Sequence, residues 1–354
     1  MKTALTLLVM TATAAPTGLE AIRFAPAQDS TVRKTFEQDL DLSQVAHTTV
    51  VDGEASTTEG GQESAQRLRL SFGDQYTAVS DDGVSELRRS FDSIAMTSTR
   101  REANALTDRP RALDIAMTSP LEGRVVVFQT TEDGTTPTIE GDGNALAEDV
   151  LAGLNEDTDL RLFLPPSADV GENARWAIDP KALAHVLAPG GDLRFEAQSS
   201  AALPGGAEAP SNPGSSPLDG WMSGDVEGAA LATFVETSTV DGHTCAVIQI
   251  ELDLSSTRDT TESAREKFAA VPMPEGGDMA LTLDFSEAVC VLKGEGELLW
   301  DLEAGRFRSF TLDARVGLVV DTAATILVGD DRRELEIRDE FTGSLRVLQD
   351  AHPE

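Results

Sequence analysis

Residues 296–320, GELLWDLEAGRFRSFTLDARVGLVV, place an apolar side chain at nearly every second position. Polar and charged residues fill most of the positions between. Successive side chains of a β-strand point to opposite faces of a sheet, so the pattern predicts long strands with one apolar face and one solvated face. Residues 303–306, EAGR, interrupt the alternation and predict a turn between two such strands.

Similar strand patterns recur on both sides of this stretch. We expect further strands around residues 68–72, 112–117, 123–129, 230–239, 244–254, 279–285 and 288–292. Helical spacing is rarer. Val84, Leu87, Phe91 and Ile94 fall on one face of a predicted amphipathic helix.

Three other segments read as short helices. They are residues 145–154 with Asn144 as N-cap, the segment opened by Asp179-Pro180, and the polar residues 259–268. The predicted fold class is therefore α+β and β-dominated, with long curved antiparallel sheets and a few amphipathic helices. Two layouts stay open: a half-barrel plugged by helices, and a sandwich of two sheets.

The length of 354 residues suits two domains or one large β domain. Residues 199–220 are rich in Ala, Pro, Gly and Ser and predict a linker or a long surface loop. This segment separates an N-terminal α+β region, residues 28–198, from a C-terminal antiparallel β region, residues 221–354. Residues 49–53 and 239–242 share a Thr-Val…Asp-Gly hairpin signature.

The N-terminus has the features of a secretory signal peptide within residues 1–27. Lys2 precedes a short apolar stretch, and small residues give cleavage sites near residue 14 or near residue 27. The alternative is a disordered cytosolic tail. No apolar run approaches the ~20 residues that a spanning helix needs. We expect an exported protein, periplasmic or extracellular, with no transmembrane segment.

The charge is strongly negative. The chain has 61 acidic and 28 basic residues, a formal net charge of −33. Nucleic acids and anionic lipids bind through Lys and Arg, so this balance argues against both as partners. We interpret the acidity first as a means of solubility, and then as attraction for divalent or cationic partners.

The chain has two cysteines, Cys245 and Cys290, both in strand-like sequence. An even number in an exported protein favours one disulfide, which would join two strands of the C-terminal region. The alternative is two separate buried thiols that behave as small apolar side chains.

No motif identifies a reaction, a cofactor or a metal. None of the four histidines lies at ligand spacing from another, and the sequence has no C-x-x-C, H-E-x-x-H or G-x-S-x-G motif. His243 and Cys245 would lie on the same face of a strand. They could act as two metal ligands or as a catalytic Cys–His pair. The alternative is an exposed histidine beside the hairpin turn and a cysteine that enters the core. Acidic loops are plentiful but lack the spacing of a calcium loop. We predict no catalytic, cofactor or metal residues.

The strand pattern resembles, in architecture, the half-barrel of bacterial lipoprotein carriers, the LolA-like fold. The sequences of residues 170–176, 294–302 and 305–306 are similar to those of a group of uncharacterised exported bacterial β-rich proteins. This resemblance covers about half of the chain. These matches consist of turns and strands. The resemblance therefore implies a fold and brings no functional residue.

Three functions follow as hypotheses. The first is an exported non-catalytic protein that binds an apolar ligand or a lipidated partner in the sheet concavity. The second is a structural or interaction module of the cell envelope whose concavity is packed by its own helices. The third is an exported hydrolase that uses paired carboxylates. The expected protein is not an enzyme, and its partner is not identified.

Overall fold

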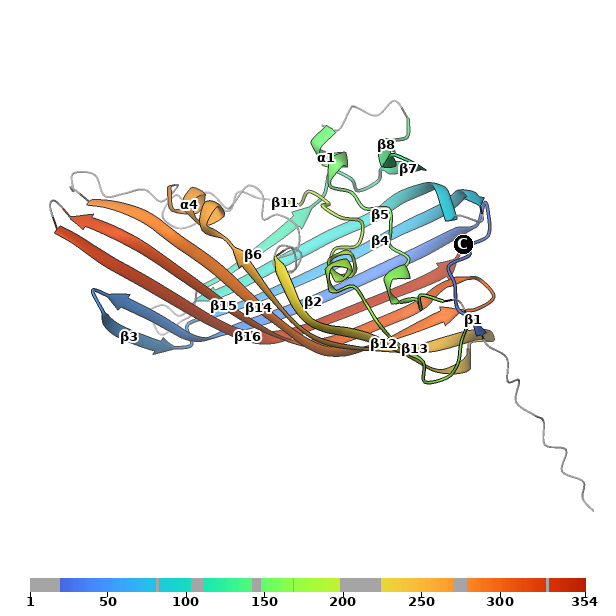
Figure 1. Ribbon diagram of the computed structural model, residues 1–354. Helices are drawn as coiled ribbons and strands as arrows, with labels where there is room; N and C mark the ends of the chain where they lie inside the picture. Colours follow the sequence, from blue (N-terminus) through green and yellow to red (C-terminus); the bar gives the residue numbers. More distant parts are fainter. Residues whose placement is uncertain are drawn as a thin grey trace, which may run out of the picture.

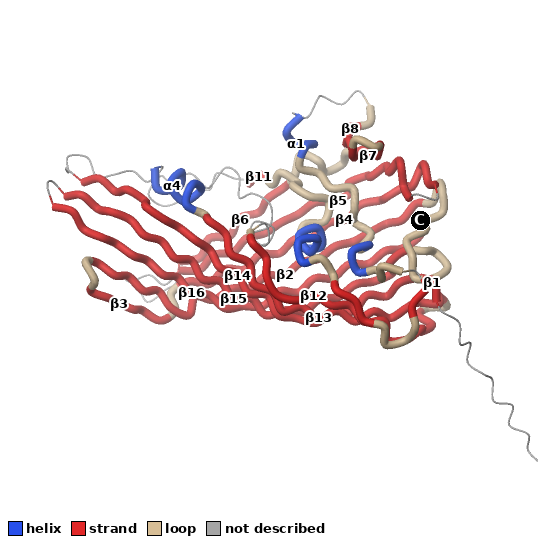
Figure 2. Tube along the Cα trace, in the orientation of Figure 1, coloured by secondary structure: helices blue, strands red, loops and turns tan. Residues whose placement is uncertain are grey.

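The computed structural model describes residues 20–80, 83–102, 111–141, 148–167, 169–197, 224–269, 279–328 and 331–354. The apolar start of the predicted signal peptide, the cap residue Asn144 and the predicted linker at 199–220 lie outside these residues. The remainder is mostly long strands, with few and short helices between them (Figure 2).

The C-terminal part is an antiparallel meander, as the alternation predicts. β14 (Met279–Asp301), β15 (Arg306–Val328) and β16 (Asp331–Pro353) have 23 residues each. The buried side chains of β15 include Phe310, Leu312, Ala314, Val316 and Leu318. The residues between them face solvent, so the apolar sides of these strands point inward together. The prediction for residues 296–320 is confirmed.

One open antiparallel sheet of 14 strands contains nearly all of the described strands. Its main order is β10-β12-β13-β14-β15-β16-β2-β4-β5-β6-β11, with β3, β7 and β8 attached beside this path. A single curved sheet replaces the sandwich alternative. β16 pairs with β2, so strands from the two regions that the sequence suggests share one sheet.

The strands outside the C-terminal meander complete the sheet. They are β2 (Thr31–Val51), β3 (Glu54–Glu59), β4 (Gln62–Ser80), β5 (Gly83–Glu102), β6 (Arg111–Thr118), β7 (Val125–Thr131), β8 (Gly134–Ile139), β10 (Arg175–Ala177), β11 (Glu196–Ala197), β12 (Asp225–Val240) and β13 (His243–Asp259). In Figure 1, strands early in the sheet order lie at the top of the left end, where β14 is above β16. At the right end this vertical order is reversed, and β4 and β5 lie above β13. The reversal shows that the sheet is strongly twisted along its strands.

The helix predicted from Val84 to Ile94 is wrong, because these residues belong to β5. Leu87 and Phe91 point inward as in an ordinary strand, but the inward position between them holds the buried charge of Arg89. The pairing with β4 then shifts, from Phe72 opposite Phe91 to Ser71 opposite Ser93, which leaves Asp92 as an extra residue. A buried Arg and a β-bulge together imitate helical spacing.

The other predicted helices are present but short. Asp179 caps a 3-10 turn, Pro180–Ala182, by accepting a hydrogen bond from the Lys181 backbone N–H, and α2 (Leu183–Leu187) follows. The polar segment after β13 forms α4 (Thr261–Ala269). Within residues 145–154 the described helix is α1 (Glu148–Ala152).

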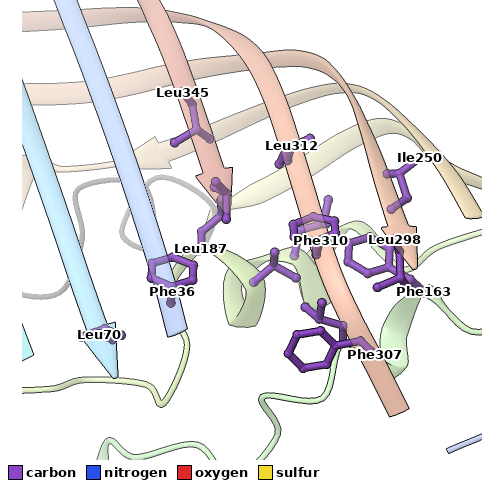
Figure 3. Packing of buried hydrophobic residues seen from close by; sticks show 14 of the residues in the cluster. Phe36, Leu70, Phe163, Leu187, Ile250, Leu298, Phe307, Phe310, Leu312 and Leu345 are labelled. Atoms are coloured by element: carbon purple, nitrogen blue, oxygen red, sulfur yellow. The ribbon is translucent and has the colours of Figure 1, made fainter. Parts of the chain in front are cut away.

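The concave face of the sheet is covered by the chain itself near the end where β2 begins. We call residues 150–167 and 169–195 the insert; it also contains β9 (Asp169–Val170), and β1 (Glu20–Ala21) pairs with β9. Phe163 of the insert stacks on Phe310, with ring centroids 5.2 Å apart, and Leu187 lies beside Phe36 (Figure 3). Gln38 donates to the Leu187 carbonyl at 3.3 Å. The insert and the sheet form one apolar core.

Residues before the second predicted cleavage site belong to this core. Ile22 is 1% exposed, and the Arg23 carbonyl accepts a hydrogen bond from the Trp300 indole at 3.2 Å. Phe24 packs edge-on against Tyr76. Cleavage near residue 27 would remove these contacts, whereas cleavage near residue 14 would keep them.

Both Asp-Gly hairpin signatures form tight turns. Asp52 and Gly53 have φ of 52° and 84°, and Asp241 and Gly242 have φ of 50° and 84°. Two consecutive left-handed residues define the turn type that matches the twist of a hairpin. These turns join β2 to β3 and β12 to β13.

The predicted disulfide is wrong: Cys245 and Cys290 are free and buried. They lie on neighbouring strands, but Cys245 pairs with Asp301 while Cys290 pairs with Ser256, eleven residues further along β13. That offset corresponds to about 36 Å of extended strand, far beyond bridging distance. The alternative reading, two separate apolar-like thiols, describes the structure.

Candidate functional site

The inner face of the sheet carries a buried group of charged and polar side chains beneath the insert. We call it the ionic cluster; its members are Lys34, Asp74, Tyr76, Arg89, Thr158 and Asp159. Four members come from the neighbouring strands β2, β4 and β5. The other two come from the insert, so the cluster lies at the contact between the insert and the sheet.

Asp74 is the centre of the cluster. Arg89 donates to its two oxygens from Nε at 2.7 Å and from Nη2 at 2.9 Å, and Lys34 Nζ donates at 2.9 Å. Thr158 adds a hydroxyl hydrogen bond at 3.0 Å. Such bidentate, charge-assisted bonds are the strong class of protein hydrogen bonds.

The same cations hold the insert. Lys34 Nζ donates to Asp159 at 2.6 Å, and the Tyr76 hydroxyl donates to the same oxygen at 2.6 Å. Arg89 also donates to the backbone carbonyls of Asn155 and Glu156, both at 2.9 Å. The guanidinium lies 4.8 Å from the ring centre of Phe72. The insert is thereby fixed at one loop.

Burial and charge act in opposite directions on these groups. Burial alone raises the pKa of Asp74, but the charges of Arg89 and Lys34 outweigh it and lower this pKa to about 2. Burial lowers the pKa of Arg89, and the Asp74 carboxylate more than compensates and raises it. Burial, then the Asp159 charge, raises the pKa of Tyr76, which stays neutral. Two cations face two carboxylates, so the cluster is balanced and has no free group for a substrate.

Two small cavities adjoin the cluster. One of about 160 Å³ is lined by Tyr76, Asp159 and Arg161, among others. Another of about 70 Å³ is lined by His185 and Gln349, and the buried Gln349 amide nitrogen has no hydrogen-bond partner among the described residues. Spaces of this size suit water or a small ion and are below the usual range of ligand pockets.

A larger hollow of about 1040 Å³ lies on the opposite, outer face of the sheet. Its floor is the middle of β13, β14, β15, β16 and β2. Six acidic, four basic and eleven uncharged residues of the described chain line it, and none of them is aromatic. We call it the outer hollow.

The strand register arranges the charges of the outer hollow in rows across the sheet. In one row Glu251 of β13 lies opposite Glu295 of β14, which lies opposite Asp313 of β15. In the row two residues away, Lys293 lies opposite Arg315. Both rows therefore place like charges on directly paired positions, an arrangement that destabilises a sheet.

Most of these carboxylates form an ion pair, whereas the central one lies beside the row of Lys293 and Arg315 without forming one. Arg175 bonds Glu251, and Arg346 lies 3.7 Å from Asp313. Lys293 pairs with Asp253 at 3.0 Å. Among the described residues, the side chains of Glu295 and Arg315 form neither a hydrogen bond nor an ion pair.

A second hollow of about 500 Å³ continues on the outer face along the same strands. Its lining includes Phe285, Val50 and Ala323, with the ion pair of Arg338 and Asp321 at its edge. Phe285 is 43% exposed, an unusual state for a large aromatic side chain. The β-bulge at Asp284 is the reason, because it turns Phe285 to the outer face.

The residues that the sequence singles out do not converge on a reactive site. His243 Nδ1 lies 2.9 Å from Asp301, while Cys245 is buried in the core. Burial, then the Asp301 charge, raises the pKa of Cys245. Within the described stretches, no group of three or more His, Cys, Asp or Glu residues is arranged to hold a metal ion.

Neither the ionic cluster nor the charged rows were predicted from the sequence. The cluster has a sequence signal: a charge occupies the inward position between two apolar residues in Val32-x-Lys34-x-Phe36, Phe72-x-Asp74-x-Tyr76 and Leu87-x-Arg89-x-Phe91. Three such interruptions with opposite charges suggest a buried ion pair. The rows on the outer face have no such signal, because they depend on strand order and register.

Comparisons with known proteins add no family. No protein-family model matches the chain, and no curated protein matches it. Among solved structures the chain is similar to an outer membrane channel from Pseudomonas putida F1, with 9% identity, 96% of this chain and 100% of that chain covered, and a TM-score of 0.20. It is also similar to OccK7 (OpdD) of Pseudomonas aeruginosa, with 8% identity, coverage of 92% and 99%, and a TM-score of 0.18. Likeness at this level carries no argument about function.

Helices in the described part of the chain fall short of the length and apolarity that a bilayer crossing requires.

Proposed function

We propose that this chain is an exported, non-catalytic interaction protein that binds its partner on the outer face of the sheet. The observation that carries the proposal is the contrast between the two faces. The insert packs the inner face near the start of β2 with its own apolar residues, whereas the outer face is open and hollowed over about 1040 Å³.

The carboxylates support a binding role over a hydrolytic one. Asp74 and Asp159 are buried but matched by Arg89 and Lys34. Those of the outer hollow are exposed and mostly paired with surface cations. A glycosidase needs one carboxyl group held protonated by an apolar surrounding, and neither set provides that environment.

An apolar ligand or lipidated partner in the concavity is the competing function. The insert fills that space where Phe163 and Leu187 meet the sheet, and the cavities beside it measure about 160 and 70 Å³. Native mass spectrometry after gentle extraction separates the two functions. We expect the bare mass of the chain, and a lipid-like adduct would contradict the proposal.

Photo-crosslinking in the producing cells tests the binding face. A photoreactive amino acid replaces Ser344, which lines the outer hollow, and in a control it replaces the exposed Glu303 in the turn before β15. We expect a discrete adduct from position 344 and none from position 303. Equal labelling from both positions, or none from position 344, would refute the proposed face.

A further inference from the structure

The second hollow on the outer face places an exposed aromatic ring near a carboxylate. Phe285 of β14 lies opposite Ala323 of β15, which lies opposite Glu336 of β16. Val50 of β2 follows on the other side of Glu336. Neighbouring strands are about 4.8 Å apart, so the backbones that carry Phe285 and Glu336 are separated by about 10 Å. The short side chain of Ala323 leaves the space between ring and carboxylate open, and these residues all line the hollow.

A braced β-bulge holds Phe285 in its exposed position. The extra residue of the bulge, Asp284, accepts a hydrogen bond from the Thr325 hydroxyl at 2.8 Å. Arg265 of α4 donates to the backbone carbonyls of Leu283 at 3.0 Å and Asp284 at 3.3 Å. Figure 1 shows α4 beside this end of β14. Bulges often redirect a side chain next to a functional site, and this one keeps an aromatic ring on the surface.

The charge around the ring is negative. The basic residue that lines the hollow is Arg338, and its charge is balanced, because it donates to Asp321 at 2.9 Å and to Glu340 at 2.8 Å. Arg265 lies at the strand edge, outside the lining. Glu336 has no hydrogen bond or ion pair among the described residues. The carboxylates of this region are Asp284, Glu287, Asp321, Glu334, Glu336 and Glu340. A cation therefore meets an excess of negative charge, and an anion is repelled.

An aromatic face near a carboxylate suits one class of cation, an ammonium ion that carries alkyl groups. The ring attracts the positive charge and also contacts the alkyl groups, while the carboxylate balances the charge. A metal ion would need several ligands, and the described acidic groups are not arranged for one. A neutral apolar molecule would leave Glu336 unused. The hollow of about 500 Å³ has the size of a small-molecule site.

We infer that the second hollow binds an alkylated ammonium ion of the choline type. The cation lies over Ala323, between the ring of Phe285 and the carboxylate of Glu336. On β15 the lining of the outer hollow ends at Gly317, six residues before Ala323, which is about 20 Å along the strand. The site therefore goes beyond the proposed function and needs no partner in the outer hollow.

The test compares two ligands of the same shape. Choline is titrated against the full chain at constant ionic strength, and binding is measured by NMR from saturation transfer to its methyl protons. The control ligand is 3,3-dimethyl-1-butanol, in which a carbon atom replaces the charged nitrogen. We expect saturable binding of choline and about tenfold weaker binding of the neutral alcohol, which loses the attraction to the ring and to the carboxylate.

Variants assign the binding to the hollow. Phe285→Leu keeps an apolar side chain but loses the aromatic face, so we expect about fivefold weaker choline binding. Phe285→Trp should strengthen binding, because the indole is the best cation acceptor among the aromatic side chains. Glu336→Gln should weaken it about threefold. The control is Glu303→Gln, which has the same net charge and lies in an exposed turn outside both hollows. Equal thermal midpoints verify that the variants fold.

A lipid headgroup and a soluble compound can both carry this ammonium group. Flotation with phosphatidylcholine vesicles separates these sources. Binding of free choline without flotation assigns a soluble ligand, and flotation that Glu336→Gln weakens assigns the headgroup.

Three results would overturn the inference. Neither free choline nor the vesicles bind, or choline and the neutral alcohol bind equally, which would leave only an apolar contact. The third is equal weakening by Glu336→Gln and Glu303→Gln, because net charge alone would then explain the affinity. Crosslinking at position 344 concerns the outer hollow, so absence of that adduct would refute the proposed function and leave the ammonium site standing.

Discussion

Single side chains in the ionic cluster decide whether the insert is held on the sheet. Arg89 is 0% exposed and contacts Asp74, Thr158 and two backbone carbonyls of the insert. Removing one partner of a buried ion pair leaves the other charge desolvated, which costs far more than the pair itself contributes. The cluster therefore acts as a single unit.

The low pKa of Asp74 predicts a loss of stability in acid. Its pKa is about 2 in the folded protein against 3.8 without these interactions. Because the pKa of Asp74 is lower in the folded than in the unfolded protein, ionised Asp74 stabilises the folded state. This stabilisation is complete above about pH 4 and is lost as the pH falls through about 2. It amounts to about 2 kcal/mol of the free energy of unfolding. Urea unfolding at several pH values measures it. Asp74→Asn should lower stability at pH 7 and flatten this pH dependence, whereas parallel curves for both proteins would contradict the assignment.

The two cysteines should behave as inert core residues. Burial raises the pKa of Cys290 to about 12, so its thiolate is scarce at neutral pH. We expect iodoacetamide to label neither thiol in the native protein and both after unfolding, as counted by intact mass. Reductant should leave the thermal midpoint unchanged; a lower midpoint would indicate a disulfide.

At the level of elements, the N-terminal segment before β2 is part of the fold. Ile22 is buried and the Arg23 carbonyl binds the Trp300 indole. We predict that the free energy of unfolding is at least about 3 kcal/mol lower for a chain starting at Gln28 than for one starting at Ala15. The shorter chain lacks the packed apolar side chains of Ile22 and Phe24. Chemical denaturation compares them. Equal stability would favour cleavage near residue 27.

Close approach between β16 and β2 requires glycine at one position. A Cβ on Gly343 would lie 1.8 Å from the Asp41 carbonyl oxygen, whereas a Cβ on Gly317 would meet only Val291 at 3.8 Å. Gly343→Ala should therefore lower the thermal midpoint strongly, and Gly317→Ala should leave it nearly unchanged. If Gly343→Ala changed the thermal midpoint as little as Gly317→Ala, β16 and β2 would be able to move apart at Gly343 without loss of stability.

Elements could be predicted from the sequence where one signal dominates. The alternation in β15 and the Asp179-Pro180 helix start are local, and both are confirmed. β5 could not be assigned, because Arg89 at an inward position and the extra residue Asp92 hide its alternation. The charged rows require the register between Glu251, Glu295 and Asp313, which is a tertiary property.

At the level of the whole molecule, self-repulsion opposes folding. A net charge of −33 raises the free energy of the compact state, and salt at 0.1 M screens this repulsion beyond about 10 Å. We predict that the thermal midpoint rises between 20 and 300 mM NaCl at pH 7, measured by calorimetry. A falling midpoint would show that surface ion pairs outweigh the general repulsion.

The position of β16 has a consequence for the order in which the sheet can form during synthesis. It is the latest strand in the described chain, yet it lies between β15 and β2, in the middle of the sheet. Until β16 is synthesised, β2 and β15 each present an unpaired edge, and unpaired edges invite aggregation. A chain that stops before β16 is therefore expected to aggregate, because the last hairpin is what closes the gap between these two edges.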